Sequence, residues 1–144
     1  MKRLVIGIDP DTIKSGYAEW DISQKLLTVS SYTFFEIFDL LQSSIDEILL
    51  VRIEAGWLNK KSNFHGRYGQ SKAVGEKIAK SVGGNHEAGK KLVEMCDYLN
   101  IPYELVKPLG TKGIDAARFK AITKFKGRTN QDMRDAGMLV FKYK

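Results

Sequence analysis

Five stretches of the chain carry hydrophobic patterns that are typical of β-strands. Residues 2–9 form a continuous apolar run of β-branched type, as expected for a strand that is buried on both faces. Residues 16–22 alternate between polar and apolar positions, which indicates a half-exposed strand, and residues 25–36 follow after a short turn. Residues 48–57 form a second buried strand, and residues 103–108 form a fifth strand. Because only brief links join the first three strands, we expect them to form an antiparallel meander.

The remaining segments change to a helical spacing of apolar positions. The expected helices cover residues 36–45, 71–82, 86–99, 115–125 and 130–143. Asn85 follows two glycines and is expected to cap the helix that ends at Asn100. The order of elements is βββαβ, then a helical connection, then βαα. A mixed sheet with helices on both faces is the arrangement that buries these patterns, which places the chain in the α/β class.

Composition narrows the picture only a little. The chain of 144 residues has a formal net charge of +6 and a pI near 9.4. This length is most simply one domain, which would cover residues 1–144. The positive charge favours a polyanionic partner, and a basic protein that is merely soluble is the alternative.

Cysteine content and hydropathy indicate the compartment. Cys96 is the single cysteine and lies among apolar residues in a helical pattern, which predicts a buried thiol. One cysteine excludes a disulfide within the chain and fits a reducing cytosol. The first apolar run is too short for a signal peptide, and nothing approaches a membrane span. We therefore expect a cytoplasmic protein that does not contact membranes.

Two acids follow buried strands. Asp9 ends the first strand and Glu54 ends the fourth. In open α/β sheets, functional groups gather at the carboxyl ends of strands. Asp9 has an alternative explanation, because Asp-Pro is a common way to leave a strand. Glu54 is harder to explain structurally, since a glutamate is a poor choice after "LLVRI" unless something binds it.

Two further acids lie three residues apart near the start of the last helix. Asp132 and Asp135 would share one helical face, with like charge beside like charge. Thr129 and Asp132 fit a helix-capping pattern, which is an alternative explanation for Asp132. Capping explains Asp135 less well, because the benefit of the helix dipole fades beyond the first turn. Arg134 lies on a different face and cannot neutralise both acids.

A convergence of all four acids would explain their presence. Each close pair of like charges costs on the order of 4 kcal/mol at ~4 Å with an effective dielectric constant of ~20. Such a site either takes up protons or holds a cation. Hard oxygen ligands select Mg²⁺ or Mn²⁺, and two such ions would activate a water and stabilise a leaving alkoxide in phosphodiester hydrolysis. The pattern therefore predicts a four-carboxylate nuclease site.

Three segments together resemble a known family. They are "IGIDPDTIKSGYAEWD" at 6–21, "VRIEAGW" at 51–57 and "TNQDMRDAGMLV" at 129–140. In order and spacing the chain resembles the RuvC-type Holliday junction resolvases of the RNase H-like (retroviral integrase) superfamily, particularly the compact phage forms. The resemblance runs nearly end to end. It implies an RNase H-like fold with a five-stranded mixed sheet, in the cytosol of a bacterium or a phage-infected host.

The resemblance also implies roles for individual residues. The catalytic, metal-binding acids fall on Asp9, Glu54, Asp132 and Asp135, which would hold two Mg²⁺ or Mn²⁺ ions. Lys107 resembles a basic residue that follows the fifth strand and assists catalysis. A second family lysine corresponds to Lys112 or Lys120, and the sequence does not choose between them. Where the family has a glycine after Asp-Pro, this chain has Asp11, a fifth acid.

Further residues are candidates for contact with DNA. Trp57 has the spacing of a family aromatic residue that probes the junction crossover, and a ring that completes the core at the sheet edge is the alternative. Backbone contacts are expected from an irregular basic segment, which could instead be a solvated loop or a dimer surface. Its basic residues are Lys60, Lys61, Arg67 and Lys72.

The function expected from these features is a metal-dependent endodeoxyribonuclease that resolves Holliday junctions and related branched DNA. We expect a homodimer, because symmetric cleavage of a four-way junction needs two active sites. An RNase H-type nuclease for RNA–DNA hybrids and a non-catalytic junction-binding protein are the alternatives. A sugar kinase or actin-like ATPase shares the first motif but would need a second nucleotide-binding domain, for which this length leaves no room.

Overall fold

The computed structural model describes the chain except for residues 60–71 and 109–112 and the side chains of residues 72–81. The strands are β1 (Leu4–Asp9), β2 (Ser15–Asp21), β3 (Leu26–Tyr32), β4 (Ile48–Glu54) and β5 (Tyr103–Val106). The helices are α1 (Phe34–Ser43), the short 3-10 helix η1 (Gly56–Leu58), α2 (Lys72–Leu99), α3 (Ala116–Thr123) and α4 (Gln131–Val140). The predicted order of strands and helices is confirmed, with one long helix in place of the two expected before β5.

The five strands form one mixed sheet in the order β3-β2-β1-β4-β5. β2 pairs antiparallel with both β1 and β3, so the predicted meander is confirmed. β4 pairs parallel with both β1 and β5. As a result, the C-terminal ends of β1, β4 and β5 lie side by side. The register there places Ile8 opposite Ile53 and Glu54 opposite Val106.

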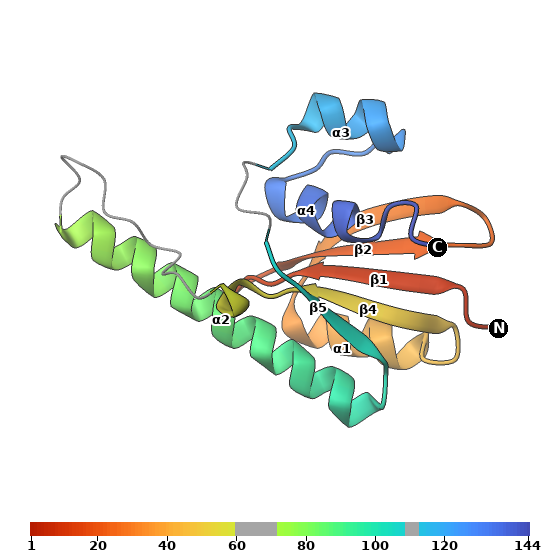
Figure 1. Ribbon diagram of the computed structural model, residues 1–144, viewed down its shortest axis with the longest axis horizontal. Helices are drawn as coiled ribbons and strands as arrows, with labels where there is room; N and C mark the ends of the chain where they lie inside the picture. The colour runs from red at the N-terminus through yellow and green to blue at the C-terminus, as the bar shows by residue number, and fades with distance from the viewer. Residues whose placement is uncertain (60–71, 109–112) are drawn as a thin grey trace.

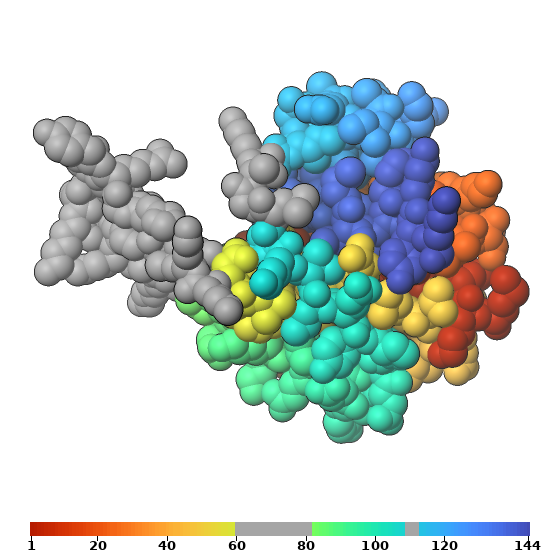
Figure 2. Space-filling model, viewed as in Figure 1, coloured from red at the N-terminus to blue at the C-terminus, as the bar shows by residue number. Residues whose placement is uncertain are grey.

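Helices cover both faces of the sheet, as predicted (Figure 1). α1 and α2 pack on one face around a core that includes Ile6 and Ile8 of β1. α4 packs on the other face, where Val5 points, and α3 forms an outer layer beyond α4 (Figures 1 and 2). The apolar run in β1 is therefore continuous because its alternate side chains enter two different cores. Cys96 is fully buried in the first of these, as predicted.

The third strand ends earlier than predicted. β3 stops at Tyr32, and α1 begins at Phe34 instead of the strand continuing to Glu36. Thr33 caps this helix, because its hydroxyl accepts from the Glu36 backbone N–H at 3.3 Å and the Glu36 carboxylate accepts from the Thr33 N–H at 2.9 Å. This reciprocal pair stabilises a helix start within a segment whose aromatic residues favour a strand.

The prediction of two helices separated at Gly83 and Gly84 is wrong, and Asn85 is not an N-cap. All three residues lie inside α2. A glycine in a helix interior costs about 1 kcal/mol relative to alanine, so local propensity favoured a break. Tertiary packing overrides it, because the C-terminal half of α2 buries Leu92 and Cys96 against the sheet. The helix ends at Leu99 and is followed by Asn100 in a left-handed conformation, as expected for a C-terminal stop.

The last two helices are shorter than predicted. α3 ends at Thr123, because Lys124 adopts a left-handed conformation with φ of 65°. α4 ends at Val140, and the following turn brings the carbonyl oxygen of Tyr143 to the indole N–H of Trp20 at 3.1 Å. No helix in the described part of the chain is both long enough and apolar enough to cross a membrane.

Candidate metal site of converging carboxylates

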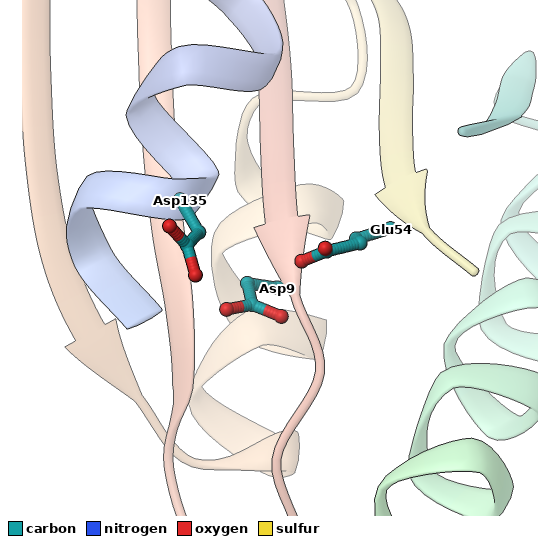
Figure 3. Close-up of side chains that lie close together, drawn as sticks. All are labelled: Asp9, Glu54 and Asp135. Carbon is teal, nitrogen blue, oxygen red and sulfur yellow. The ribbon is translucent and has the colours of Figure 1, made fainter. Parts of the chain in front are cut away.

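Three acids from three different elements meet at the C-terminal ends of the parallel strands. Asp9 is the last residue of β1, Glu54 is the last residue of β4, and Asp135 lies in the second turn of α4. One carboxylate oxygen from each lies within 4.8 Å of the others, and the three side chains point toward one another (Figure 3). All three are half-buried. The parallel pairing of β1 with β4 produces the first two positions, because both strands end beside each other.

The third position depends on how closely α4 approaches the sheet. Gly16 in β2 lies against the start of α4, where a Cβ would overlap the carbonyl oxygen of Asp132. A residue with any side chain at this position would push the helix outward. The glycine therefore allows the first two turns of α4 to lie directly on the antiparallel strands, which brings Asp132 and Asp135 to the end of β1.

The fourth predicted acid joins the cluster on its other side. Asp132 is half-buried and within hydrogen-bonding reach of both Asp9 and Asp11. The turn after β1 holds Asp11 in place, since its backbone N–H donates to the hydroxyl of Ser15 at 3.0 Å and its carboxylate accepts from the backbone N–H of Ile13 at 3.3 Å. The structure thus brings all four predicted acids together, with Asp11 as a fifth.

The capping explanation for Asp132 is wrong. Asn130 is the N-cap of α4, and its side-chain oxygen accepts from the backbone N–H of Met133 at 2.9 Å. The hydroxyl of Thr129 instead accepts from the guanidinium of Arg134 at 2.9 Å. That guanidinium group, through its Nε, also donates to the carbonyl oxygen of Ile114. Asp132 therefore does not take part in the cap, although it lies in the first turn of the helix, where a negative charge is favoured.

The carboxyl groups perturb one another strongly. Burial, a hydrogen bond with Glu54, the charge of Glu54 and the charges of Asp132 and Asp135 raise the pKa of Asp9 from 3.8 to about 10. Burial, followed by the charge of Asp11, raises the pKa of Asp132 to about 6. Without a cation, Asp9 therefore keeps a proton at neutral pH. A divalent cation would take the place of that proton, and an all-oxygen donor set suits Mg²⁺ or Mn²⁺.

A hollow of about 230 Å³ opens beside the triad. Asp9, Glu54 and Asp135 line it, together with residues that include Trp57, Asn85 and His86. Asn85 and His86 were not among the site residues predicted from the sequence. Nothing in the local pattern could have identified them, because their position depends on where the long α2 packs.

Trp57 lies between the core and the hollow. Its ring is half-buried, packs against the core and covers Gly89 of α2, where a Cβ would overlap the ring. The ring also meets that of His86 edge-on, with centroids 6.3 Å apart. The tryptophan is thus partly a core residue and partly a wall of the hollow. Its contact with a junction crossover stays a prediction.

The predicted basic residues are placed less completely. Lys107 is exposed and follows β5 at the same sheet edge as Glu54, and the adjacent Pro108 lines the hollow. Lys120 is exposed on α3. Lys72 begins α2, but its side chain lies outside the described part of the structure. The remaining candidates also lie outside the described residues: Lys60, Lys61, Arg67 and Lys112.

Basic residues gather on α3 and on the segment that follows it, and of these only Lys120 was predicted to contact DNA. Its five members are exposed, and the sequence from 113 to 130 contains a single acid, Asp115. We call this the α3 basic surface. It consists of Arg118, Lys120, Lys124, Lys126 and Arg128.

Comparison with known proteins supports the fold. No protein-family model matches the chain, and no curated protein matches it. Solved structures do match. Thermus thermophilus RuvC in complex with a Holliday junction substrate aligns over 96% of this chain and 91% of its own, with 13% identity and a TM-score of 0.58. Another Thermus thermophilus RuvC structure aligns over the same shares, with 11% identity and a TM-score of 0.47.

The alignment at this low identity establishes architecture. It covers the mixed sheet together with the helices on both of its faces. The chain therefore has a RuvC-like fold of the RNase H-like type.

Proposed function

We propose that this protein is a metal-dependent endodeoxyribonuclease that cleaves branched DNA, with the four-way junction as its main substrate. The observation that carries the proposal is the convergence of Asp9, Glu54 and Asp135 within 4.8 Å at the end of the central strands. Like charges gathered in this way destabilise a fold unless they take up protons or bind a cation, and they are often found at functional sites. A carboxylate cluster beside an open hollow in a basic protein suits phosphodiester hydrolysis.

Two cations are part of this proposal. Asp9 contacts Glu54 on one side and Asp132 on the other. Glu54 and Asp135 would complete one cation site with Asp9, and Asp132 would extend the site on the side of Asp11. When bound, two Mg²⁺ or Mn²⁺ ions would supply an activated water and stabilise the leaving alkoxide. The contribution of the chain is to hold the acids at this spacing before the cations arrive.

The distribution of charge supports a nucleic-acid substrate. The chain has a net charge of +6 even though five acids gather in the cluster. α3 lies on the outer layer of the molecule (Figure 2), and the side chains of the α3 basic surface are exposed, so a DNA backbone can reach them. Lys107 is exposed at the edge of the sheet that holds the acids. Contacts of this kind position a duplex without reading its sequence.

Branched DNA is the preferred substrate in this proposal for two reasons. A solved structure with this fold is a complex with a Holliday junction substrate. A homodimer of this chain would also present two carboxylate sites to the symmetric strands of a four-way junction. One experiment tests both the choice of substrate and the dimer.

The experiment compares four labelled substrates: a four-way junction, a linear duplex, a single-nicked fork and an RNA–DNA hybrid. Each is incubated with the protein in Mg²⁺, in Mn²⁺ or in Ca²⁺, and light scattering determines the oligomeric state. We expect paired cleavage of the junction in Mg²⁺ or Mn²⁺, binding without cleavage in Ca²⁺, and a dimer. Asp9→Asn is the matched control and should bind the junction without cutting it.

Three outcomes would contradict the proposal. Binding of the junction without cleavage in any cation would indicate a non-catalytic junction-binding protein. Preferential cleavage of the hybrid would indicate an RNase H-type activity. Equal cleavage by the parent protein and Asp9→Asn would show that the carboxylate cluster is not the active site.

A further inference from the structure

Residues of two chemical kinds line the hollow beside the acids. Its metal-binding wall consists of the carboxylates Asp9, Glu54 and Asp135. Other lining residues come from α2 and η1 and include Asn85, His86 and Trp57, all half-buried. The carboxylates can accept cations, whereas these three side chains carry the N–H groups of an amide, an imidazole and an indole. A ligand that fills the hollow can therefore bind cations through some of its oxygens and accept hydrogen bonds at others.

The usual partners of a phosphate do not line this hollow. Among the described residues around it, none is a lysine or an arginine. Lys107 lies nearby in the chain, but Pro108 is the residue that lines the hollow. In the described part of the site, a phosphodiester held against the metal-binding wall would therefore meet Asn85 and His86 as side-chain donors on α2.

The position of these two donors is built into the packing of α2. Gly84, immediately before Asn85, lies so close to the loop after β1 that a Cβ would be 2.8 Å from Thr12 Cγ2. One turn further along the helix, Gly89 lies beneath the ring of Trp57. Each glycine costs the helix about 1 kcal/mol relative to alanine. In return, both allow the turn that carries Asn85 and His86 to lie against the acidic site.

We propose that His86, together with Asn85, binds a non-bridging oxygen of the phosphodiester backbone of bound DNA. This proposal rests on the function proposed above and adds a binding subsite to it. The imidazole of His86 donates to the phosphate oxygen that faces away from the carboxylates, and the amide of Asn85 donates beside it. The two residues thus hold the DNA strand against the metal-binding wall, while the acids hold the cations.

The main competing explanation is that His86 only packs against Trp57, since the two rings meet edge-on. Two substitutions separate packing from hydrogen bonding. His86→Phe keeps a ring beside Trp57 but removes the donor, whereas His86→Gln removes the ring but keeps an N–H donor. Gly83→Ala is the control on the same helix, because a Cβ at that position meets no atom within 4 Å.

The test measures binding of a labelled four-way junction to the full-length protein in Ca²⁺, followed by single-turnover cleavage in Mg²⁺. We expect His86→Phe to weaken binding by roughly tenfold or more, as for the loss of a hydrogen bond to a charged group. His86→Gln should retain most of the affinity, and Asn85→Ala should show a smaller loss. Melting temperature and Mn²⁺ affinity should match those of the parent in His86→Phe, because neither the core nor the carboxylates have changed.

The results separate this inference from the proposed function. If His86→Phe binds and cleaves as well as the parent while His86→Gln does not, the histidine is a packing residue and the subsite does not exist. Equal affinity of both variants with that of the parent would also overturn the inference and leave the nuclease proposal intact. A parent protein that binds no DNA in Ca²⁺ would overturn both proposals.

Discussion

The backbone of Gly16 lies directly against the backbone of Asp132. A Cβ on Gly16 would overlap the Asp132 carbonyl oxygen and would lie 2.9 Å from the backbone nitrogen of Met133. The obstacle is main chain in the first turn of a helix, so no side-chain rotation can relieve it. The second strand and the last helix are separated by more than one hundred residues in the sequence, and their contact positions two of the acids.

Gly16→Ala should therefore separate α4 from the sheet. We expect a loss of roughly 2–4 kcal/mol in the free energy of unfolding, at the upper end for overpacked sites. Loss of Mn²⁺ affinity should accompany it, because Asp132 and Asp135 move together with the helix. Urea unfolding and Mn²⁺ titration measure the two effects. Gly83→Ala is the control and should stabilise the protein by about 0.5–1 kcal/mol, since its Cβ meets open space. A Gly16→Ala variant with parental stability would show that α4 can shift freely.

The contrast between these glycines shows what the sequence could and could not predict. The five strands and the positions of Asp9 and Glu54 follow from local hydrophobic patterns, because parallel strands that end together bring their last residues together. The unbroken α2 does not follow from such patterns. Its two adjacent glycines are a local signal for a helix end, and packing of the helix against the sheet overrides that signal.

Two predictions within the site, the N-cap of α4 and the set of residues near the acids, were wrong or incomplete for a similar reason. The predicted N-cap, Thr129, lies one residue before the actual N-cap, Asn130. Threonine and asparagine are both favourable N-cap residues, so residue type alone does not choose between them. His86 was missed because its distance from the acids depends on the direction of a helix of 28 residues. The local sequence does not determine the direction in which this helix runs.

Stability without metal should depend on pH through Asp9. The pKa of Asp9 is about 10 in the folded protein, whereas an aspartate in the unfolded chain has its usual pKa of 3.8. Between these values the folded protein keeps a proton that the unfolded chain releases, so the free energy of unfolding falls as pH rises. The stability that Asp9 contributes is fully present below pH 3.8 and is lost as the pH rises through about 10. The slope is at most about 1.4 kcal/mol per pH unit for one proton.

Urea unfolding from about pH 5 to about pH 9 in the presence of a chelator measures this slope. Asp9→Asn cannot titrate at this position, so its stability should fall less than that of the parent over the same range. Saturating Mn²⁺ should flatten the parent curve, because the cation displaces the proton. Parallel curves for the parent and Asp9→Asn would show that Asp9 does not hold the proton.

The α3 basic surface should contribute to the salt dependence of DNA binding. Each phosphate contact that is lost should reduce the slope of log K against log salt by about 0.9. The double variant Lys120→Gln, Lys126→Gln should therefore reduce the slope by roughly 1–2. The matched control neutralises Lys90 and Lys91 on α2, which are exposed and paired with Glu87 and Glu94. Equal slopes for the two double variants would place the DNA elsewhere on the molecule.

Asp135 gives the sharpest separation between a structural role and a metal-binding role. Its carboxylate accepts a hydrogen bond of 2.7 Å from the side-chain amide of Gln131, and an asparagine carbonyl can accept the same bond. Asp135→Asn therefore keeps the local contact and removes one negative charge from the cluster. Without metal, we expect the variant to melt at or slightly above the temperature of the parent, because repulsion between Asp135 and Asp132 is relieved.

With metal, the order of stability should reverse. The parent should gain stability from Mn²⁺ in proportion to its affinity, whereas Asp135→Asn has lost one of the three oxygens that converge within 4.8 Å and should gain much less. Junction cleavage by the variant should fall below detection, while junction binding in Ca²⁺ should persist through the basic residues. Thermal melts with and without Mn²⁺, run beside the cleavage assay, measure all of these effects on one preparation. A variant that melts markedly lower without metal, or that keeps full activity, would show that Asp135 stabilises the helix and does not hold the cation.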